Sequence, residues 1–171
     1  MSQAIREEIT IYATYLVANG GCASFDITYL SRALDLSIAT IESYYLSKDE
    51  ILLDVLKQIS LCTPECFLKH IEFCLEDKQV AQLKRKKLKR KIEGFFKLNP
   101  LGLAYVHIYC ELNADPKFSR FINVIEENWA KTIELIFYMN HQKNSAKKYF
   151  NSLIHSIYNL KNSKCLNVTI H

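Results

Sequence analysis

Apolar residues near the N-terminus recur at steps of three and four, the spacing that places side chains on one face of a helix. The set is Ile5, Ile9, Tyr12 and Leu16. The adjacent pair Gly20 and Gly21 supplies the kind of residue at which helices commonly end. The pattern therefore predicts a first helix that stops at this glycine pair.

Two short helices are predicted next, each with its own capping residue. Asp26 can accept a hydrogen bond from the first turn of a helix over residues 27–34, and Ser37 can do the same for a helix over residues 38–45. Only Asp35 and Leu36 separate the two helices. Two short helices joined by so tight a turn suggest a helix-turn-helix.

Helix-start signals also mark the rest of the chain. Ser47 and Glu50 form a capping box, in which each side chain satisfies a free backbone amide of a fourth helix. Pro64, Pro100 and Pro116 each follow a capping residue directly, as prolines do at the first helical position. The further helices are expected over residues 80–98, 100–112, 116–138 and 146–161, with a loose tail after Lys161.

Two of these helices carry long apolar faces. The helix over 116–138 has a stripe that suits lengthwise packing, comprising Phe118, Ile122, Ile125, Trp129, Thr132, Ile136 and Met139. The last helix has an apolar face wider than one neighbour needs, comprising Tyr149, Phe150, Leu153, Ile154, Ile157 and Tyr158, which suggests a homodimer seam. Since no segment alternates as a strand, we predict an all-α fold with a helix-turn-helix head over residues 1–46 and a helical ligand-binding and dimerisation body over residues 47–171.

Composition supports a folded helical protein but divides its charge unevenly. Of the 171 residues, 49% are hydrophobic, and only four are Gly and three Pro. The net charge is +4. Residues 1–58 contain four basic and eight acidic side chains, a net charge of −4. The remainder has a net charge of +8, with seven basic residues between Lys84 and Lys91.

The expected compartment is the cytoplasm. No apolar run approaches the roughly 18 residues of a membrane-spanning helix, and the N-terminus lacks a basic patch followed by an apolar signal region. The six cysteines include no CxxC pair and are too sparse for a disulfide scaffold. We expect most of them to be reduced, buried thiols.

Residues 5–56 resemble the TetR family of bacterial transcriptional regulators. The resemblance rests on Gly20, Leu30 and Ser31, Leu34 to Ser37, Thr40 and Ile41, Tyr44 and Tyr45, and the run from Ser47 to Leu52. It covers about a third of the chain. It implies a homodimer that reads a near-palindromic DNA operator, most simply as a repressor. It also implies that a small-molecule effector binds in the body and releases the homodimer from DNA.

The resemblance also implies the DNA-contacting residues. A recognition helix in the major groove offers its N-terminal side chains to base edges, while flanking groups anchor phosphates. Here the groove-facing set would be Ser37, Ile38, Ala39, Thr40, Ser43 and Tyr44. Thr28 would approach the DNA backbone and Lys48 would hold a phosphate. Ile41 and Tyr45 would point into the core of the head.

Two departures from the family pattern leave an alternative open. Asp35 replaces the usual turn glycine, although it can adopt the left-handed conformation at modest cost. Glu42 stands where a phosphate-contacting Tyr is usual, and a carboxylate is repelled by DNA, although Glu can also read cytosine. Since the head is net negative, the alternative is a degenerate TetR-like ligand-binding or protein-interaction protein that no longer binds DNA.

Residues in the body suggest a ligand pocket more than catalysis. Phe96, Tyr105, His107, Tyr109 and Trp129 could line an amphipathic pocket, or belong to an ordinary helical core. We expect no enzyme activity, cofactor or metal, since there is no nucleophile elbow, phosphate loop or HExxH motif.

Two further motifs have a structural and a functional interpretation. The series Cys62, Cys66, His70 and Cys74 fits core packing better than a metal or thiol sensor, because its ends lie too far apart on a helix to share one zinc ion. The basic run from Lys84 to Lys91 fits either a solvated helix face or a patch that binds an anionic partner.

Overall fold

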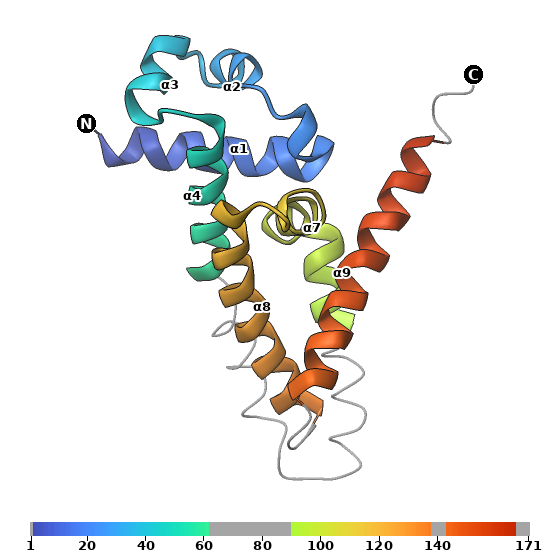
Figure 1. The fold of residues 1–171 in the computed structure, drawn as a ribbon. Helices are drawn as coiled ribbons and strands as arrows, with labels where there is room; N and C mark the ends of the chain where they lie inside the picture. The colour runs from blue at the N-terminus through green and yellow to red at the C-terminus, as the bar shows by residue number, and fades with distance from the viewer. Residues whose placement is uncertain (1, 62–89, 138–142, 167–171) are drawn as a thin grey trace.

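The computed structural model of the chain describes residues 2–61, 90–137 and 143–166. These residues form helices with short connections, and none of them lies in a strand, so the all-α fold class is confirmed. The labelled helices in Figure 1 are α1 (Gln3–Ser24), α2 (Ile27–Leu34), α3 (Ile38–Tyr44), α4 (Lys48–Leu61), α7 (Pro100–Leu112), α8 (Pro116–Phe137) and α9 (Lys143–Leu166). Residues 90–98 are also helical.

Local capping sets the bounds of α2 and α3 where the sequence predicted them. The Asp26 side chain accepts a hydrogen bond from the backbone amide of Thr28, and the Ser37 side chain accepts one from the amide of Thr40. Between the helices, Asp35 adopts the left-handed conformation at φ 52° and ψ 37°. The turn is therefore tight, and the predicted helix-turn-helix geometry is present.

The first helix breaks at the predicted place but does not end there. Gly21 has φ 79° and ψ 174° inside α1, a backbone conformation that is open essentially only to glycine. One further turn follows as far as Ser24. The glycine pair therefore redirects the end of α1 instead of terminating it.

The predicted capping box is present at the start of α4. The Ser47 hydroxyl accepts the Glu50 amide at 3.4 Å, whereas the Glu50 carboxylate accepts the amide of Leu46 at 2.7 Å. Further along, Asn99 caps α7 with Pro100 at its first turn, and Asp115 accepts the amide of Lys117 at the start of α8. These two proline-led helices begin where the sequence predicted.

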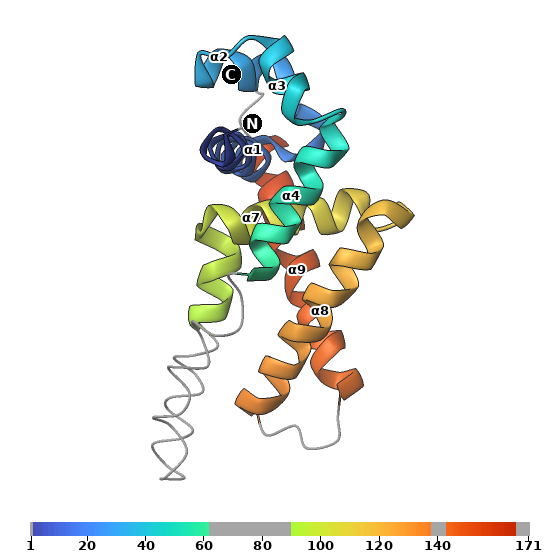
Figure 2. The same cartoon turned by 90° about the vertical axis from the view of Figure 1, so that its left-hand side faces the viewer.

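Helix α1 lies between the two halves of the molecule. Figures 1 and 2 show α2 and α3 on one side of it and α7 on the other, with α2 and α3 at the end of the molecule farthest from α8. Helix α1 packs against α7 and α4, α4 packs against α8, and α9 packs against both α7 and α8. The predicted division of the chain at residue 46 stays a prediction, because α1 packs on the body as well as on the head.

Aromatic rings fill the centre of the body. Phe96 lies 4.9 Å from Trp129 and 5.5 Å from Phe150 between ring centroids, and the Trp129 and Phe150 rings are stacked 6.2 Å apart. Tyr105 lies 6.0 Å from both Phe96 and Phe150. All four residues are buried. The described part of the α8 stripe, from Phe118 to Thr132, is buried as predicted.

Helix α9 departs from the sequence prediction in two ways. It continues to Leu166, so the tail expected to be loose after Lys161 begins as helix. Phe150, Ile154 and Ile157 are buried within the protomer, while Tyr149, Leu153 and Tyr158 are half-buried. Packing within the protomer thus accounts for part of the width of this apolar face, without a second protomer. Pro64, the cysteine and histidine series from Cys62, and the basic run up to Lys89 lie outside the described residues.

Candidate functional site

Helix α3 presents one face to solvent and buries the other. Ile41 and Tyr45 are buried at 0% and 1% exposure, and they join Leu30 in the core of the head. The outward residues are Ser37, Ile38, Ala39, Glu42 and Ser43, all exposed, with Thr40 and Tyr44 half-buried. The structure therefore brings the predicted groove-facing residues together on one surface.

The hydroxyl groups of α3 are partly engaged in holding the helix itself. Ser37 Oγ accepts the Thr40 amide at 3.0 Å and lies 2.8 Å from Thr40 Oγ1. Ser43 Oγ donates to the Thr40 carbonyl at 2.7 Å. These bonds fix the side-chain rotamers at the start of the helix. The exposed carboxylate of Glu42 lies on the same surface.

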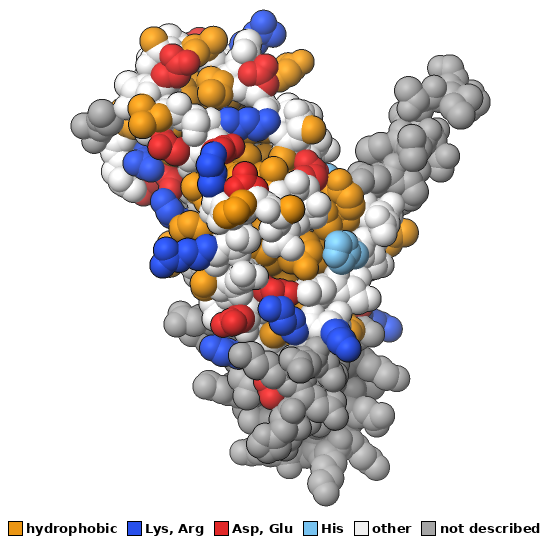
Figure 3. Space-filling model, viewed as in Figure 1, with side chains coloured by type: hydrophobic (Ala, Val, Ile, Leu, Met, Phe, Trp, Pro, Cys, Tyr) orange, Lys and Arg blue, Asp and Glu red, His pale blue; other side chains and the backbone are white. Residues whose placement is uncertain are grey.

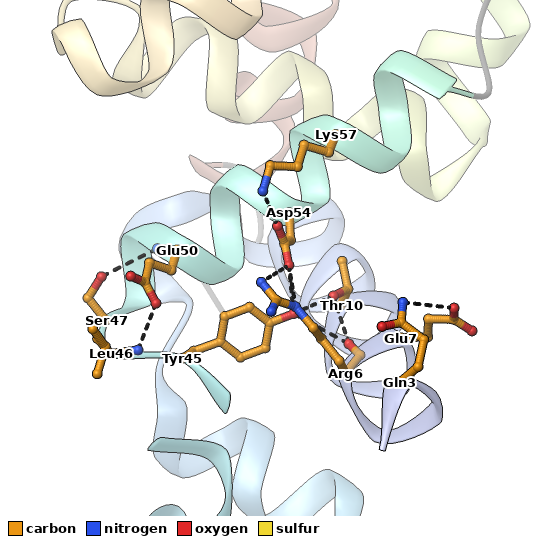
Figure 4. A network of polar contacts seen from close by, with 10 residues as sticks. All are labelled: Gln3, Arg6, Glu7, Thr10, Tyr45, Leu46, Ser47, Glu50, Asp54 and Lys57. Atoms are coloured by element: carbon orange, nitrogen blue, oxygen red, sulfur yellow. Dashed lines mark hydrogen bonds and ion pairs between the residues drawn. The ribbon is translucent and has the colours of Figure 1, made fainter. Parts of the chain in front are cut away.

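A buried polar network fastens the end of α3 to α1 and α4. Figure 4 shows the Tyr45 hydroxyl pointing between Thr10 and Asp54, at 2.9 Å from Thr10 Oγ1 and 3.1 Å from Asp54 Oδ2. Arg6 donates to the same Asp54 oxygen from Nε at 2.8 Å and Nη2 at 2.7 Å. Lys57 donates to the other Asp54 oxygen at 2.7 Å. One carboxylate thus connects three helices.

The network keeps Asp54 ionised. Burial acts to raise the pKa of Asp54, but the hydrogen bonds from Lys57, Arg6 and Tyr45 outweigh it and lower the pKa overall. Burial raises the pKa of Tyr45, although its hydrogen bond with Thr10 opposes the change. At neutral pH the site therefore consists of a carboxylate, two cations and a neutral phenol.

The two predicted phosphate contacts have different surroundings. Thr28 is half-buried in the first turn of α2. Lys48 Nζ donates to the Cys22 carbonyl at 2.6 Å and lies 5.4 Å from the centre of the Phe25 ring. Its ammonium is thus engaged by two residues of the head, and a phosphate contact at Lys48 stays a prediction.

The structure shows a hydrogen-bonded contact between the head and the body that sequence reasoning missed. The Glu111 carboxylate of α7 accepts the backbone amides of Cys22 at 2.9 Å and Ala23 at 3.3 Å, just after the break at Gly21. Its other oxygen lies 2.8 Å from His107 Nδ1. A carboxylate at the free amides of a helical turn is favourable for the same reason as a helix N-cap. Glu111 therefore fixes the end of α1 to α7.

The five predicted ligand residues do not all meet. Phe96, Tyr105 and Trp129 belong to the packed aromatic centre of the body. His107 faces Glu111 and the Tyr158 ring, and Tyr109 lies 5.9 Å from Tyr105 and 5.6 Å from the His155 ring. The first three form a common cluster, and the other two lie along α7 beside α9. Their role in ligand binding stays a prediction.

Polar groups are also buried in this aromatic region. Glu126 of α8 is 4% exposed and pairs with Lys147 of α9 at 2.9 Å. The Tyr105 hydroxyl and Asn151 Oδ1 are buried and make no hydrogen bond with the residues that the structure describes. Burial, followed by the nearby Glu126 charge, raises the pKa of Tyr105 well above its ordinary value and that of Tyr109 to about 12. Both phenols are therefore neutral donors.

Cys22 and Cys110 are free thiols with little thiolate character. Burial, followed by the nearby Glu111 charge, raises the pKa of Cys22 to about 12 and that of Cys110 to about 11. Across residues 2–61, 90–137 and 143–166, no three His, Cys, Asp or Glu side chains are placed to hold a metal ion. None of the helices in these same ranges combines the length and apolarity needed to cross a membrane.

The geometry defines an all-helical protein with a small helix-turn-helix head on a larger helical body. No protein-family model and no curated protein matches the sequence. A solved structure described as the molecular basis for control of antibiotic production by bacterial hormones is similar, with a TM-score of 0.55 and 12% sequence identity over 92% of this chain and 97% of that chain. The two proteins share a fold.

Proposed function

We propose that the chain is a TetR-like transcriptional regulator that binds operator DNA through α3, as a homodimer, and acts as a repressor released by a small molecule. The observation that carries the proposal is the two-sided α3. Ile41 and Tyr45 anchor it from beneath, while its opposite face is exposed at the far end of the molecule (Figures 1 and 2). A helix supported in this way is suited to enter the major groove. We assign the protein no catalytic role.

The small-molecule part of the proposal is supported by the structural neighbour and by the body. The neighbour's description concerns control by bacterial hormones, and its fold covers nearly all of this chain. In this chain, Tyr105 places a buried hydroxyl without a described partner among aromatic rings, and Asn151 Oδ1 is also buried without one. A mostly apolar region with a few polar groups is what small-molecule sites require.

The homodimer part is supported by surface that the protomer does not cover. Val124 on α8 is 50% exposed, and Leu153 and Tyr158 on α9 are half-buried. Figure 3 shows hydrophobic side chains gathered near α7 and α9, in the middle of the face in view. A second protomer packed against α8 and α9 would bury this surface, and the resulting homodimer would present two heads to the operator.

A second candidate is supported by cations in the head and on the adjoining α4 that already have partners within the protein. Arg6 and Lys57 both pair with Asp54, and Lys48 donates to the Cys22 carbonyl. Figure 3 shows acidic and basic side chains interspersed over the head on the face in view. Because phosphate neutralisation supplies most non-specific affinity, such a head could serve a ligand-binding or protein-interaction protein that does not contact DNA.

Fluorescence anisotropy with DNA from upstream of the protein's own gene, measured across a salt series, separates the two candidates. The regulator predicts binding that weakens steeply as salt rises. Glu42→Gln should tighten it, because a repulsive carboxylate on the α3 surface is removed. Glu127→Gln is the matched control, since it changes the net charge equally but lies exposed on α8. Absence of DNA binding, or binding whose affinity does not depend on the salt concentration, would favour the second candidate.

A further inference from the structure

Two hollows lie along the same side of α1, separate from the aromatic cluster of the body. The first, of about 370 Å³, lies between α1 and α4 and is lined by Arg6, Asp54 and Lys57 among others. The second, of about 240 Å³, lies between α1, α4 and the start of α7 and includes Tyr15, Pro100 and Leu101. Ile11 and Gln58 line both hollows. The two form one groove, which we call the α1–α4 groove.

The two ends of the α1–α4 groove differ in chemistry. At one end Arg6 and Lys57 are 43% and 52% exposed and share the carboxylate of Asp54, which is only 14% exposed. Arg6 has five N–H donors and Lys57 has three, so several donors remain after their bonds to Asp54. Figure 4 shows Arg6 reaching Asp54 from α1, and Lys57 reaching it from one turn further along α4. This end is therefore suited to an acceptor group such as a carboxylate.

The other end of the α1–α4 groove is mainly apolar. Ile11 and Tyr15 are 48% and 51% exposed, although both are large hydrophobic residues. The Pro100 and Leu101 side chains form the facing wall. Arg6 and Tyr15 are nine positions apart on α1, a separation of about 14 Å at helical rise. The distance between the polar and apolar ends suits an extended chain.

We propose that the α1–α4 groove binds an amphipathic small molecule, with its carboxylate at Arg6 and Lys57 and its apolar chain over Ile11 and Tyr15. Glu7 also lines the polar end, where its carboxylate accepts a bond from Gln3 at 3.3 Å. Its charge opposes an anionic ligand and so limits the affinity. A molecule bound here contacts α1, α4 and the start of α7 at once, and thereby stabilises the head against the body.

Isothermal titration calorimetry of the full chain with sodium octanoate tests the proposal, with 1-octanol as the uncharged probe. Octanoate should bind with one site per protomer and more weakly at high salt. Lys57→Gln should weaken octanoate about two- to fivefold and leave 1-octanol unchanged, as expected for a partly exposed ion pair. Glu7→Gln should strengthen octanoate binding by a similar factor.

Ile11→Gln tests the apolar end and should weaken both probes about fivefold, because it removes part of the apolar wall. Tyr12→Gln is the matched control, since Tyr12 is 40% exposed on the same helix but lines neither hollow. Absence of octanoate binding, or equal effects of Ile11→Gln and Tyr12→Gln, would overturn the proposal. No DNA is present in this experiment, so its failure leaves the regulatory function untouched.

Discussion

The hydroxyl of Tyr45 offers a direct test of how α3 is held. Thr10 Oγ1 donates its own proton to the Arg6 carbonyl at 2.8 Å, so the phenol proton of Tyr45 is the one shared between Thr10 Oγ1 and Asp54 Oδ2. Tyr45→Phe deletes this proton without changing the ring. Because one acceptor is a carboxylate with little solvent access, we expect a loss of about 1.5 kcal/mol in the free energy of unfolding.

Asp54→Asn should lower the free energy of unfolding by about 2 kcal/mol for a related reason. It removes the charge that Arg6 and Lys57 share, but those two cations are half exposed and each pair contributes only about 0.5 kcal/mol. The rest is the weakened bond to Tyr45. The double variant should therefore lose about 1 kcal/mol less than the sum of the single losses, since the two residues share one interaction.

Urea denaturation of the four proteins measures this coupling, and thermal unfolding gives a second measure. For a chain of this size, about 1.5 kcal/mol corresponds to a fall in Tm of about 3–6 °C. Tyr44→Phe is the control, because the Tyr44 hydroxyl only accepts the Ser2 amide at 3.3 Å. If Tyr45→Phe costs no more than Tyr44→Phe, or if the coupling is below about 0.3 kcal/mol, the network does not hold α3 in place.

The lowered pKa of Asp54 adds a pH signature to the same experiment. A carboxyl whose pKa is lower in the folded state than in the unfolded state contributes stability above the unfolded value, about 3.9. That contribution is lost as pH falls through the folded value. The wild-type protein should therefore lose more stability between about pH 5 and pH 2 than Asp54→Asn does.

Four further substitutions give distinct outcomes in unfolding experiments. Gly21→Ala should lower the free energy of unfolding by about 2–3 kcal/mol, because φ is 79° and the added Cβ would lie 2.7 Å from Glu111 Oε1. Gly94→Ala should instead stabilise its helix by up to about 1 kcal/mol, because the added Cβ would meet nothing within 4 Å. Equal effects of the two glycine substitutions would contradict the strained backbone. Ser37→Ala removes the N-cap of α3 and should cost about 1 kcal/mol; an unchanged Tm would show that the cap is not used. Tyr105→Phe should leave Tm unchanged or raise it by a few degrees, because it removes a buried hydroxyl without a described partner, and a clear fall in Tm would reveal one.

Local signals in the sequence predicted what local interactions determine. The bounds of α2 follow from Asp26, whose side chain caps an amide two positions away, and the start of α7 follows from Asn99 and Pro100 in the same way. The left-handed Asp35 also needs no distant partner. The buried face of α3 was predicted from the resemblance, and the four-residue spacing of Ile41 and Tyr45 agrees with both side chains lying on one side of the helix.

Interactions between distant positions left no such pattern. Cys22 and Glu111 are 89 positions apart, and Arg6 and Asp54 are 48 apart, so neither joint could be read from spacing. Lys48 illustrates the consequence. The resemblance implied that Lys48 holds a phosphate, whereas folding brings the Cys22 carbonyl, 26 positions away, within hydrogen-bonding distance of its ammonium. Long, flexible charged side chains bind the nearest acceptor that the tertiary fold provides.

The two joints of α1 bear on how the head and the body communicate. Near its start, Arg6 reaches Asp54 of α4, and after its break at Gly21 the free amides meet Glu111 of α7. Between these points α1 packs along α7 while carrying α2 on its other side. Because packed helices resist continuous deformation, a shift of α7 has to move α1 with it or break the Glu111 contact. The α1–α7 contact therefore couples the two parts of the molecule, and we expect a movement in the body to reach α3 through α1 as well as through α4.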